Sequence, residues 1–328
     1  MKAQQQWVAI QPATATATVP GTCGEWVQGT LDDVPCLVSC AIDWYAHITV
    51  TVEPTTTTWT LPDGASKMAQ ALRLALWNRV YSTGLALAAR GSPPIGGHVR
   101  SDNPLPPGRG YASSTADVAG VIYALGWALG APFAPWEVAS LAVQVEPSDG
   151  TMFPELTLFA HRTGAFVRPL GGLPPLSVVV VDPGGFVDTL AFNAADHRAA
   201  LRRLAPIHRD AFTMLESGLK AGDAALVARA ATLSAMAHQE ILFSPLVEAC
   251  LSFLPSTKAL GICRAHSGTI VGLICDPAQA DFVAKQAAER FAGCAVRVHR
   301  CVGGIPLTPP QVCLPAVAPT RKDAIIPS

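Results

Sequence analysis

One segment near the middle of the chain restricts the possible folds more than any other: a loop of prolines and glycines that leads directly into an uncharged run. Residues 103–117 read Asn-Pro-Leu-Pro-Pro-Gly-Arg-Gly-Tyr-Ala-Ser-Ser-Thr-Ala-Asp, and the run that follows, Val118 to Trp136, carries no charge. The prolines stiffen the approach, while Gly108 and Gly110 permit backbone angles that are closed to other residues. The pattern predicts a loop that enters the N-terminus of a buried helix over 114–131.

A loop of this kind is suited to binding an anion. The first amide groups of a helix have no partner within the helix, and the helix dipole places partial positive charge there. Three consecutive hydroxyl residues, Ser113, Ser114 and Thr115, can add hydrogen bonds or a magnesium ligand. The segment is therefore interpreted as a triphosphate site. The alternative is that Ser114 and Asp117 form only a capping box and that the glycines belong to an ordinary loop.

Other well-known loop motifs do not match. None of the six lysines follows a glycine, so a Walker-A loop is excluded. Gly108 and Gly110 lack the third glycine of the dinucleotide fingerprint, and no acidic residue follows at the expected distance. No Gly-x-Ser-x-Gly sequence occurs, which argues against an α/β-hydrolase.

Composition narrows the class of protein further. The chain has 328 residues, 50% hydrophobic and 14% charged, with 23 lysines and arginines against 24 aspartates and glutamates. The balance leaves no basic excess for a nucleic-acid partner. The uncharged run contains Pro132 and Pro135, which limits its helical part to 118–131 and makes it too short to cross a bilayer, so no membrane association is expected. A polar N-terminus without a signal peptide, and nine irregularly spaced cysteines, favour a cytoplasmic protein.

The remaining pattern predicts an α+β chain in two domains. Strands are expected at 46–52, 156–160, 165–167, 177–181, 259–264, 269–275 and 295–300, and helices at 66–81, 114–131, 136–145, 196–219, 223–242, 245–253 and 278–292. The break at Leu170 to Pro175 separates a domain over 1–170, which carries the phosphate loop, from an α+β domain over 171–328. The second domain ends in a proline-rich, irregular tail from Pro306 on.

Three segments in order resemble the galactokinase, homoserine kinase, mevalonate kinase and phosphomevalonate kinase (GHMP) superfamily. The loop, Pro-x-x-x-Gly-x-Gly-x-x-Ser-Ser, is similar to its phosphate-binding motif; 19–25, Val-Pro-Gly-Thr-Cys-Gly-Glu, to its first motif; and 264–269, Arg-Ala-His-Ser-Gly-Thr, to its glycine-rich third motif. The resemblance implies a two-domain fold with an N-terminal mixed αβ domain and a C-terminal ferredoxin-like α/β sandwich. It also implies the cofactors ATP and Mg²⁺.

The sequences of these motifs depart from the superfamily's usual pattern. Tyr111 and Ala112 separate Gly110 from Ser113, and the third motif keeps few glycines. With these particular residues, the three segments are similar to the motifs of the branch that phosphorylates L-threonine for cobalamin synthesis. Alternatives are a kinase of homoserine or another amino alcohol, and a non-catalytic nucleotide-binding regulator on the same scaffold. The expected partner is a small amino-acid substrate; the sequence does not indicate an oligomeric state.

The resemblance assigns roles to individual residues. The nucleotide site comprises Pro107, Gly108, Arg109, Gly110, Tyr111, Ala112, Ser113, Ser114 and Thr115. Ser114 and Glu146 are the candidate metal ligands, and Asp149 is the candidate base that takes a proton from the substrate hydroxyl. The substrate site comprises Gly24, Glu25, Asp43, His266 and Ser267. For Glu146 and Asp149 the alternative is a solvated turn. For Arg109 the alternative is a side chain that faces solvent. For Glu25 and Asp43 it is the cap of a turn or strand end, and for His266 it is a structural contact between loops.

Overall fold

A single long β-hairpin is the central element of the fold. The computed structural model describes residues 13–82, 95–187, 192 and 196–306. Strand β1 (Ala13–Leu31) and strand β2 (Val34–Glu53) pair antiparallel over almost their whole length. They are joined at Asp32 and Asp33, whose φ angles of 49° and 62° match a two-residue hairpin turn. The sequence predicts only 46–52 of this hairpin as strand, so most of it was missed.

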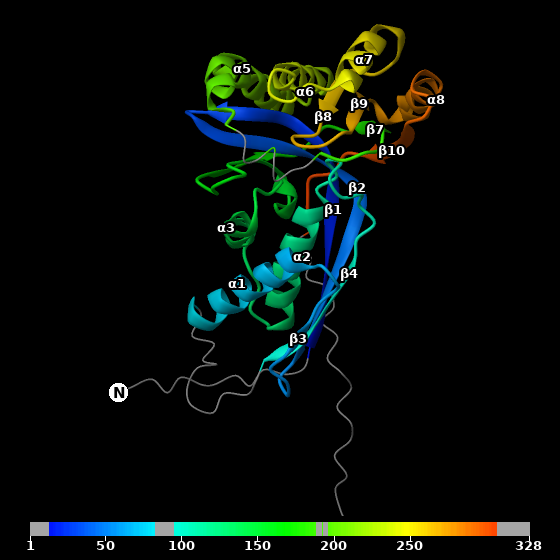
Figure 1. Ribbon diagram of the computed structural model, residues 1–328. Helices are drawn as coiled ribbons and strands as arrows, with labels where there is room; N and C mark the ends of the chain where they lie inside the picture. Colours follow the sequence, from blue (N-terminus) through cyan, green and yellow to red (C-terminus); the bar gives the residue numbers. More distant parts are fainter. Residues whose placement is uncertain (1–12, 83–94, 188–191, 193–195, 307–328) are drawn as a thin grey trace, which may run out of the picture.

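The hairpin bends where its register is irregular. Register shifts occur between Pro20 and Thr22, between Thr22 and Glu25, and between Glu25 and Val27. Bulges of this kind bend and twist a strand locally. In Figure 1 the hairpin runs beneath α5 and α6 and then turns to run alongside α2. The first of the three motifs, which contains the bend, therefore lies where the two parts of the molecule meet.

The hairpin is the centre of one continuous sheet. The strand order is β10-β7-β9-β8-β1-β2-β4-β3, with β5 and β6 paired beside β2. The other strands are β3 (Trp59–Thr60), β4 (Gly96–Asp102), β5 (Leu156–Phe159), β6 (Val167–Gly171), β7 (Ser177–Asp182), β8 (Gly261–Arg264), β9 (Val271–Cys275) and β10 (Ala295–Arg300). β8 joins the hairpin through the pairing of Glu25 with Arg264. The first and third motifs thus meet within the sheet itself.

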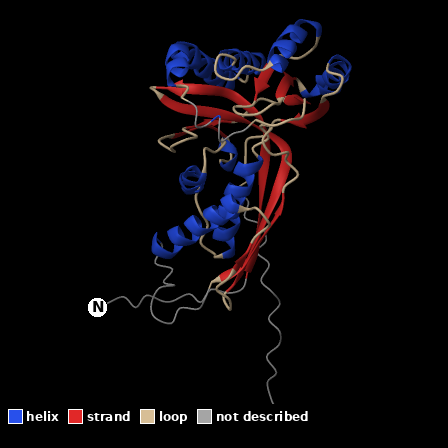
Figure 2. Ribbon diagram, viewed as in Figure 1, coloured by secondary structure: helices blue, strands red, loops and turns tan. Residues whose placement is uncertain are grey.

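The helices cover the sheet in two groups (Figure 2). α1 (Ser66–Ser82), α2 (Ser113–Ala128) and α3 (Pro135–Val145) lie beside one end of the hairpin. α5 (Arg198–Ala221), α6 (Ala224–His238), α7 (Pro245–Phe253) and α8 (Ala280–Arg290) cover the other end, and short 3₁₀ helices span Gly150–Met152, Leu254–Ser256 and Pro277–Gln279. α2 is buried along nearly its whole length, and Gly120 permits it to approach Ile48 of β2 closely.

The architecture confirms the predicted fold class. The second half of the chain runs strand, helices, two strands, helix, strand, and its antiparallel strands lie in the order β10-β7-β9-β8, as in a ferredoxin-like unit. β4 was not predicted. The boundary proposed after residue 170 falls within β6 and stays a prediction, and the proline-rich tail lies almost wholly outside the described residues. Within the described ranges, no helix combines the length and apolar character needed to cross a bilayer.

Candidate active site

The phosphate loop is fixed by hydrogen bonds from the two other motifs. From the first motif, the amides of Thr22 and Gly24 donate to the carbonyls of Tyr111 (3.1 Å) and Gly110 (3.3 Å). From the third, the amide of Thr269 donates to the carbonyl of Arg109 (2.9 Å). Three segments far apart in the sequence therefore form one backbone-bonded unit, which sets the loop's conformation before any ligand binds.

Close packing explains which glycines this unit needs. A Cβ atom on Gly268 would lie 2.3 Å from the carbonyl oxygen of Arg109, and one on Gly110 would lie 2.2 Å from the Cβ of Ala265. Gly24, with φ of 62°, would place a Cβ 2.1 Å from the carbonyl oxygen of Arg264. The third motif has thus lost most of its glycines but keeps the one that touches the phosphate loop.

Helix α2 begins without a side-chain cap. Ala112 occupies the position before the helix in a left-handed conformation, with φ of 58°, and the helix starts at Ser113. The carboxylate of Asp117 accepts hydrogen bonds from Ser101 Oγ (2.8 Å) and Asn103 Nδ2 (3.1 Å). The alternative interpretation of Ser114 and Asp117 as a capping box is therefore wrong. The first-turn amides, which no side chain occupies, stay available for a ligand.

A cleft of about 790 Å³ opens at this helix N-terminus. Its lining includes these predicted residues: Pro107, Gly108, Gly110, Tyr111, Ala112, Ser113, Ser114, Thr115, Glu146, Asp149 and Ser267. Its opposite wall is the segment from Pro62 to Met68, at the start of α1. Residues 62–68 were not predicted as part of the site, because their sequence carries no recognisable binding motif.

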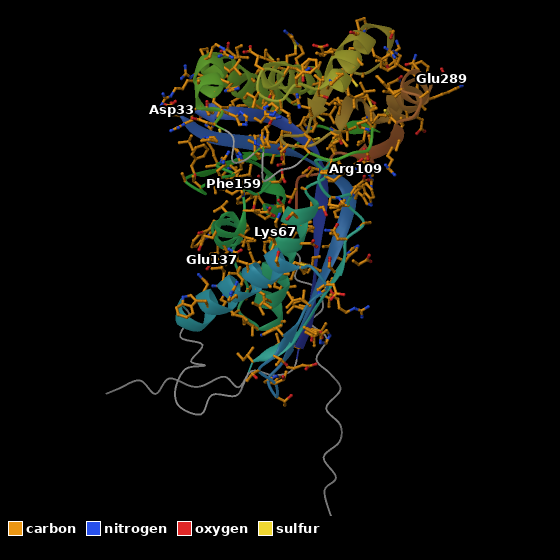
Figure 3. All side chains as sticks on the ribbon, viewed as in Figure 1. Asp33, Lys67, Arg109, Glu137, Phe159 and Glu289 are labelled. Atoms are coloured by element: carbon orange, nitrogen blue, oxygen red, sulfur yellow. The ribbon has the colours of Figure 1, made fainter. Side chains whose placement is uncertain are left out.

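Arg109 has a different position from that expected. Its Nη1 lies 3.1 Å from Oδ2 of Asp182, whose side chain is fully buried at the end of β7. Tyr111 donates its hydroxyl to the same oxygen at 3.1 Å. Arg109 is not part of the cleft lining, although Figure 3 places it at the level where the two parts of the molecule meet. The guanidinium anchors the phosphate loop to β7.

The two candidate metal ligands are adjacent, and a lysine accompanies them. Ser114 Oγ donates to Glu146 Oε1, and Lys67 Nζ lies 2.6 Å from Glu146 Oε2 and 3.1 Å from Ser114 Oγ. Lys67 comes from the first turn of α1 and lies near the centre of Figure 3. Lys67 was not predicted, because its partners lie 47 and 79 residues away. The hydroxyl of Ser114 and the carboxylate of Glu146 are therefore close enough together to contact one positive group, the Lys67 ammonium.

Asp149 lies deep in the cleft and interacts with Glu25. Thr115 Oγ1 donates to Asp149 Oδ2 (3.2 Å) and accepts from the Asp149 amide (3.1 Å). Burial raises the pKa of both carboxyl groups, and the pKa of Glu25 is raised further by the charge of Asp149. A hydrogen bond from Glu25 lowers the pKa of Asp149 in turn. The two carboxyl groups therefore titrate as a coupled pair, and the pKa of each is raised above its usual value.

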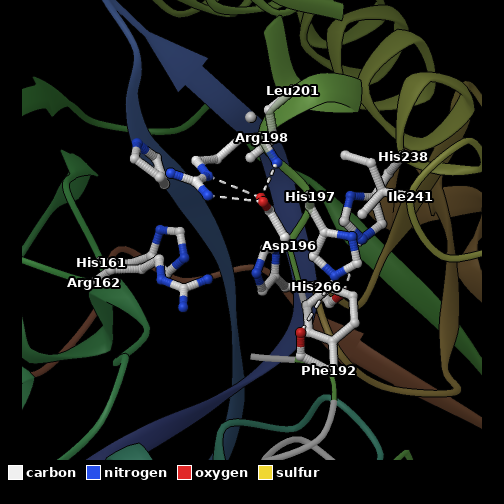
Figure 4. A pocket seen from close by; sticks show the side chains of 12 residues that line it. His161, Arg162, Phe192, Asp196, His197, Arg198, Leu201, His238, Ile241 and His266 are labelled. Atoms are coloured by element: carbon white, nitrogen blue, oxygen red, sulfur yellow. Dashed lines mark hydrogen bonds and ion pairs between the residues drawn. The ribbon is translucent and has the colours of Figure 1, made fainter. Parts of the chain in front are cut away.

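Of the five predicted substrate residues, only Ser267 is among the residues that line the cleft. The carboxylate of Asp43 accepts from the amide (2.9 Å) and Nε (2.9 Å) of Arg300, and so joins β2 to β10 as the strand-end interpretation expected. Hydrogen bonds from Arg300 keep the pKa of Asp43 below its usual value, although burial opposes them. His266 lines a second cavity (Figure 4), whereas its neighbour Ser267 lines the cleft. Gly24 belongs to the clamp on the phosphate loop.

The combination of these groups defines a class of protein. A loop held at a helix N-terminus, the adjacent oxygens of Ser114 and Glu146, and the carboxylate of Asp149 share one cleft. Phosphoryl transfer needs these parts, because its catalysis is mainly positioning and charge stabilisation. The cleft is the site of a small-molecule kinase.

Comparisons with known proteins agree with this class. Residues 78–153 match the model of the GHMP kinases N terminal domain. The chain is 32% identical to an L-threonine kinase of Salmonella typhimurium over 80% of its length and 83% of the relative, and 29% identical to one of Citrobacter freundii over 80% and 86%. A homoserine kinase structure from Cytophaga hutchinsonii superposes with a TM-score of 0.66 at 14% identity, covering 95% of this chain and 99% of that one. The chain belongs to the GHMP kinases, in the branch that includes these two relatives.

Proposed function

We propose that this kinase transfers the γ-phosphoryl group of Mg²⁺-ATP to the side-chain hydroxyl of L-threonine, giving O-phospho-L-threonine and ADP. The observation that carries the reaction type is that Asp149 and the Ser114–Glu146 pair line the same cleft as the phosphate loop. The amino-acid acceptor is supported by the two L-threonine kinases to which the chain is similar. The three motifs of this chain, which resemble those of the branch that phosphorylates L-threonine for cobalamin synthesis, further suggest a place in that synthesis.

The nucleotide would occupy the cleft between α1 and α2. The amides and hydroxyls of Ser113, Ser114 and Thr115 would hold the phosphates at the positive end of the α2 dipole. The segment from Pro62 to Met68 forms the wall that would contact the base and ribose. Arg109, bonded to Asp182, would act on the loop rather than on the phosphates.

The donor set fits magnesium. Hydroxyl and carboxylate oxygens are the ligands that Mg²⁺ prefers, and it usually takes few from protein and the rest from phosphates and water. Ser114 and Glu146 supply such a pair, and among the described residues no group of three or more histidines, cysteines, aspartates or glutamates could hold a metal. The ion would neutralise charge on the phosphates. Lys67, which contacts both ligands, would turn its ammonium group toward the phosphate oxygens.

Asp149 would act as the base. The threonine oxygen forms a bond to the γ-phosphorus, the bond from that phosphorus to the ADP oxygen breaks, and the hydroxyl proton passes to the Asp149 carboxylate. Burial raises the pKa of Asp149, which makes it a stronger proton acceptor near neutral pH. The hydrogen bond from Glu25 offsets part of that rise.

The test is release of ADP by the purified protein from Mg²⁺-ATP, with L-threonine, L-homoserine, L-serine or no acceptor. The phosphorylated product would be identified by phosphorus NMR. We expect turnover with L-threonine well above the other acceptors, and an Asp149→Asn variant that still binds ATP but loses turnover. Preference for L-homoserine would keep the reaction type and discard the acceptor. ATP binding without turnover on any hydroxyl acceptor would reject the proposal.

A further inference from the structure

Asp182, the last residue of β7, carries a fully buried carboxylate that has no part in the proposed chemistry. It is not among the residues that line the cleft. Removing a carboxylate from water is costly, and a buried ion pair is often no more stabilising than apolar side chains of similar size. The stability of the sheet therefore does not explain a charge at this position, and its contacts suggest a role in the site.

Both side chains that flank Gly110 in the phosphate loop end on this carboxylate. Arg109 Nη1 lies 3.1 Å from Asp182 Oδ2, and the Tyr111 hydroxyl donates to the same oxygen at 3.1 Å. Hydrogen bonds to a charged group are stronger than those between neutral groups. One atom at the end of β7 therefore fixes the direction of the side chains on either side of Gly110.

The carbonyl groups of the same loop are held by the other two motifs. Besides the bonds from their amides described for the site, the carbonyl of Gly110 accepts from Thr22 Oγ1 (2.9 Å), and that of Arg109 accepts from the amide of Ile270 (3.2 Å). In a trans peptide, the N–H of the next residue points opposite to the carbonyl. The amides of residues 110–112 therefore point away from these motifs, and all three residues line the cleft. Successive backbone amides of this kind bind anions.

The other oxygen of the carboxylate orders the segment that follows β7. The amide of Gly184 donates to Asp182 Oδ1 (2.9 Å), and the amide of Val187 donates to the carbonyl of Gly108 (3.0 Å). Gly184 has a left-handed φ of 76°, which helps to turn the chain. The segment 183–187 thus returns from β7 to the start of the phosphate loop. Asp182 therefore contacts both the loop and the segment that lies against it.

A second arginine near the carboxylate provides an internal comparison. Arg297 Nη1, on β10, lies 3.9 Å from Asp182 Oδ2, and its side chain is 44% exposed, against 35% for Arg109. The two arginines place similar positive charge beside one oxygen, but only Arg109 belongs to the phosphate loop. A difference between their variants therefore measures the tether to the loop and not the charge.

We propose that Asp182 is a positioning residue of this kinase, which holds the side chains on both sides of Gly110 so that the loop amides keep the orientation that binds the nucleotide phosphates. The proposal rests on the proposed function, in which the loop binds Mg²⁺-ATP. Asp182 acts through Arg109 and Tyr111. Its loss should therefore weaken nucleotide binding and leave the affinity for the acceptor unchanged.

The first experiment measures binding of Mg²⁺-ADP by calorimetry, without turnover. We expect Asp182→Asn and Arg109→Gln each to raise the dissociation constant about tenfold or more, as removal of a group that orients a ligand-binding residue does. Arg297→Gln should stay within about twofold, because partly exposed ion pairs contribute little. Equal losses in the two arginine variants would indicate a charge effect and overturn the proposal. If Asp182→Asn does not fold, Arg109→Gln tests the same contact from a partly exposed side chain.

A double-mutant cycle separates positioning from a general loss of structure. If Asp182 acts through the loop side chains, Asp182→Asn combined with Arg109→Gln should bind Mg²⁺-ADP no more weakly than Asp182→Asn alone. Additive losses would contradict this. In steady state, the KM for ATP should rise in Asp182→Asn while the KM for L-threonine stays within about twofold. An equal rise in both would indicate that the whole site is loosened, and would reject the positioning role.

The outcomes separate this inference from the function on which it rests. If the wild type phosphorylates L-threonine and both Asp182→Asn and Arg109→Gln bind Mg²⁺-ADP as it does, the positioning role is rejected and the kinase stands. If the wild type phosphorylates no acceptor but binds Mg²⁺-ADP in a manner that depends on Asp182, the function is rejected and the positioning role is supported. If the wild type neither binds nucleotide nor phosphorylates an acceptor, both are rejected.

Discussion

Two coupled carboxyl groups, Glu25 of the first motif and Asp149 in the lining of the cleft, interact with each other. Glu25 is 3% exposed and lies on the bent part of β1, while Asp149 follows α3 and is held by Thr115. Because burial disfavours both charges, only one of the groups ionises readily. The one that faces the phosphate loop can serve as a base, and its partner tunes it.

A pair of substitutions at Glu25 tests this tuning. Glu25→Leu removes the donor that lowers the pKa of Asp149, so the acid limb of the kcat/KM profile for L-threonine should move to higher pH. Glu25→Gln keeps an N–H donor, so its limb should stay near that of the wild type. The measurement is kcat/KM from pH 5 to 9. Superimposed profiles for the two variants would show that Glu25 does not act on Asp149.

Lys67 gives a second prediction at this scale. Lys67→Met should lower kcat/KM for Mg²⁺-ATP by about 100-fold, the cost typical of losing one group that stabilises transition-state charge. Lys67→Arg keeps the charge and should recover part of the loss. Lys285→Met, an exposed lysine on α8, serves as the control. Equal rates for Lys67→Met and the control would remove Lys67 from the mechanism.

Much of the site could be predicted from local motifs, whereas contacts between residues far apart in the sequence could not. Residues 107–115 were named because a glycine loop that enters a helix indicates an anion site, whereas Glu146, Asp149 and Ser267 were named from the resemblance to the GHMP kinases. Lys67 could not be predicted as a site residue, because it lies in an ordinary helix and its partners in the site are 47 and 79 positions away in the sequence. The bond of Arg109 to Asp182, 73 residues later, was hidden for the same reason.

At the scale of secondary-structure elements, the contact between two loops determines the shape of the phosphate site. The loop before α2 is held by the turn between β8 and β9, with Gly268 packed on the backbone of Arg109. Backbone cannot move aside as a flexible side chain can. The predicted position of the third motif was right, but its fit against the loop depends on sheet register, which the sequence does not reveal.

Gly268→Ala should disturb this contact without altering any chemical group. Its Cβ would lie 2.3 Å from the Arg109 carbonyl oxygen, so the loop must shift; we expect a cost of about 1–3 kcal/mol and a raised KM for ATP. Gly172→Ala, at a site with no atom within 4 Å, is the control. The measurements are the free energy of unfolding and the KM for ATP. A variant that matches this control in both would contradict the packing argument.

Buried histidines make the stability of the whole molecule depend on pH. Burial lowers the pKa of His161, His208, His238 and His266, to about 4 for His208 and about 3 for His266. In the unfolded chain these groups take up protons near pH 6.5, whereas the folded protein does so only at lower pH. Protonation therefore favours unfolding, and this contribution to stability, present above pH 6.5, is lost as pH falls below it.

The predicted signature is a free energy of unfolding that falls between pH 7 and pH 5. His208→Gln keeps an acceptor for the amide of Thr30 but cannot be protonated, so its stability should fall less steeply. The difference in slope is at most about 1.4 kcal/mol per pH unit. Denaturant titrations at several pH values decide between parallel and diverging curves.

The shared sheet also predicts cooperative unfolding. β1 contacts both groups of helices: it packs against α2 at one end and against α5 and α6 at the other. We expect near-ultraviolet circular dichroism and tryptophan fluorescence to report one coincident transition in urea. Two separated transitions would instead support independent domains divided near residue 170. The helices and second-half strands were predictable from periodicity, but the hairpin that unites them was not, because Pro20, Gly21 and Gly24 resemble strand breakers.

The pairing of Glu25 with Arg264 has a consequence for the synthesis of the protein. The two residues are 239 positions apart (264 minus 25), and they join β1 to β8. At about 5–20 residues per second, roughly 12–50 s pass between the synthesis of one and of the other. Throughout that interval the edge of β1 that later pairs with β8 has no strand partner, and an unpaired edge of this kind can pair with another chain.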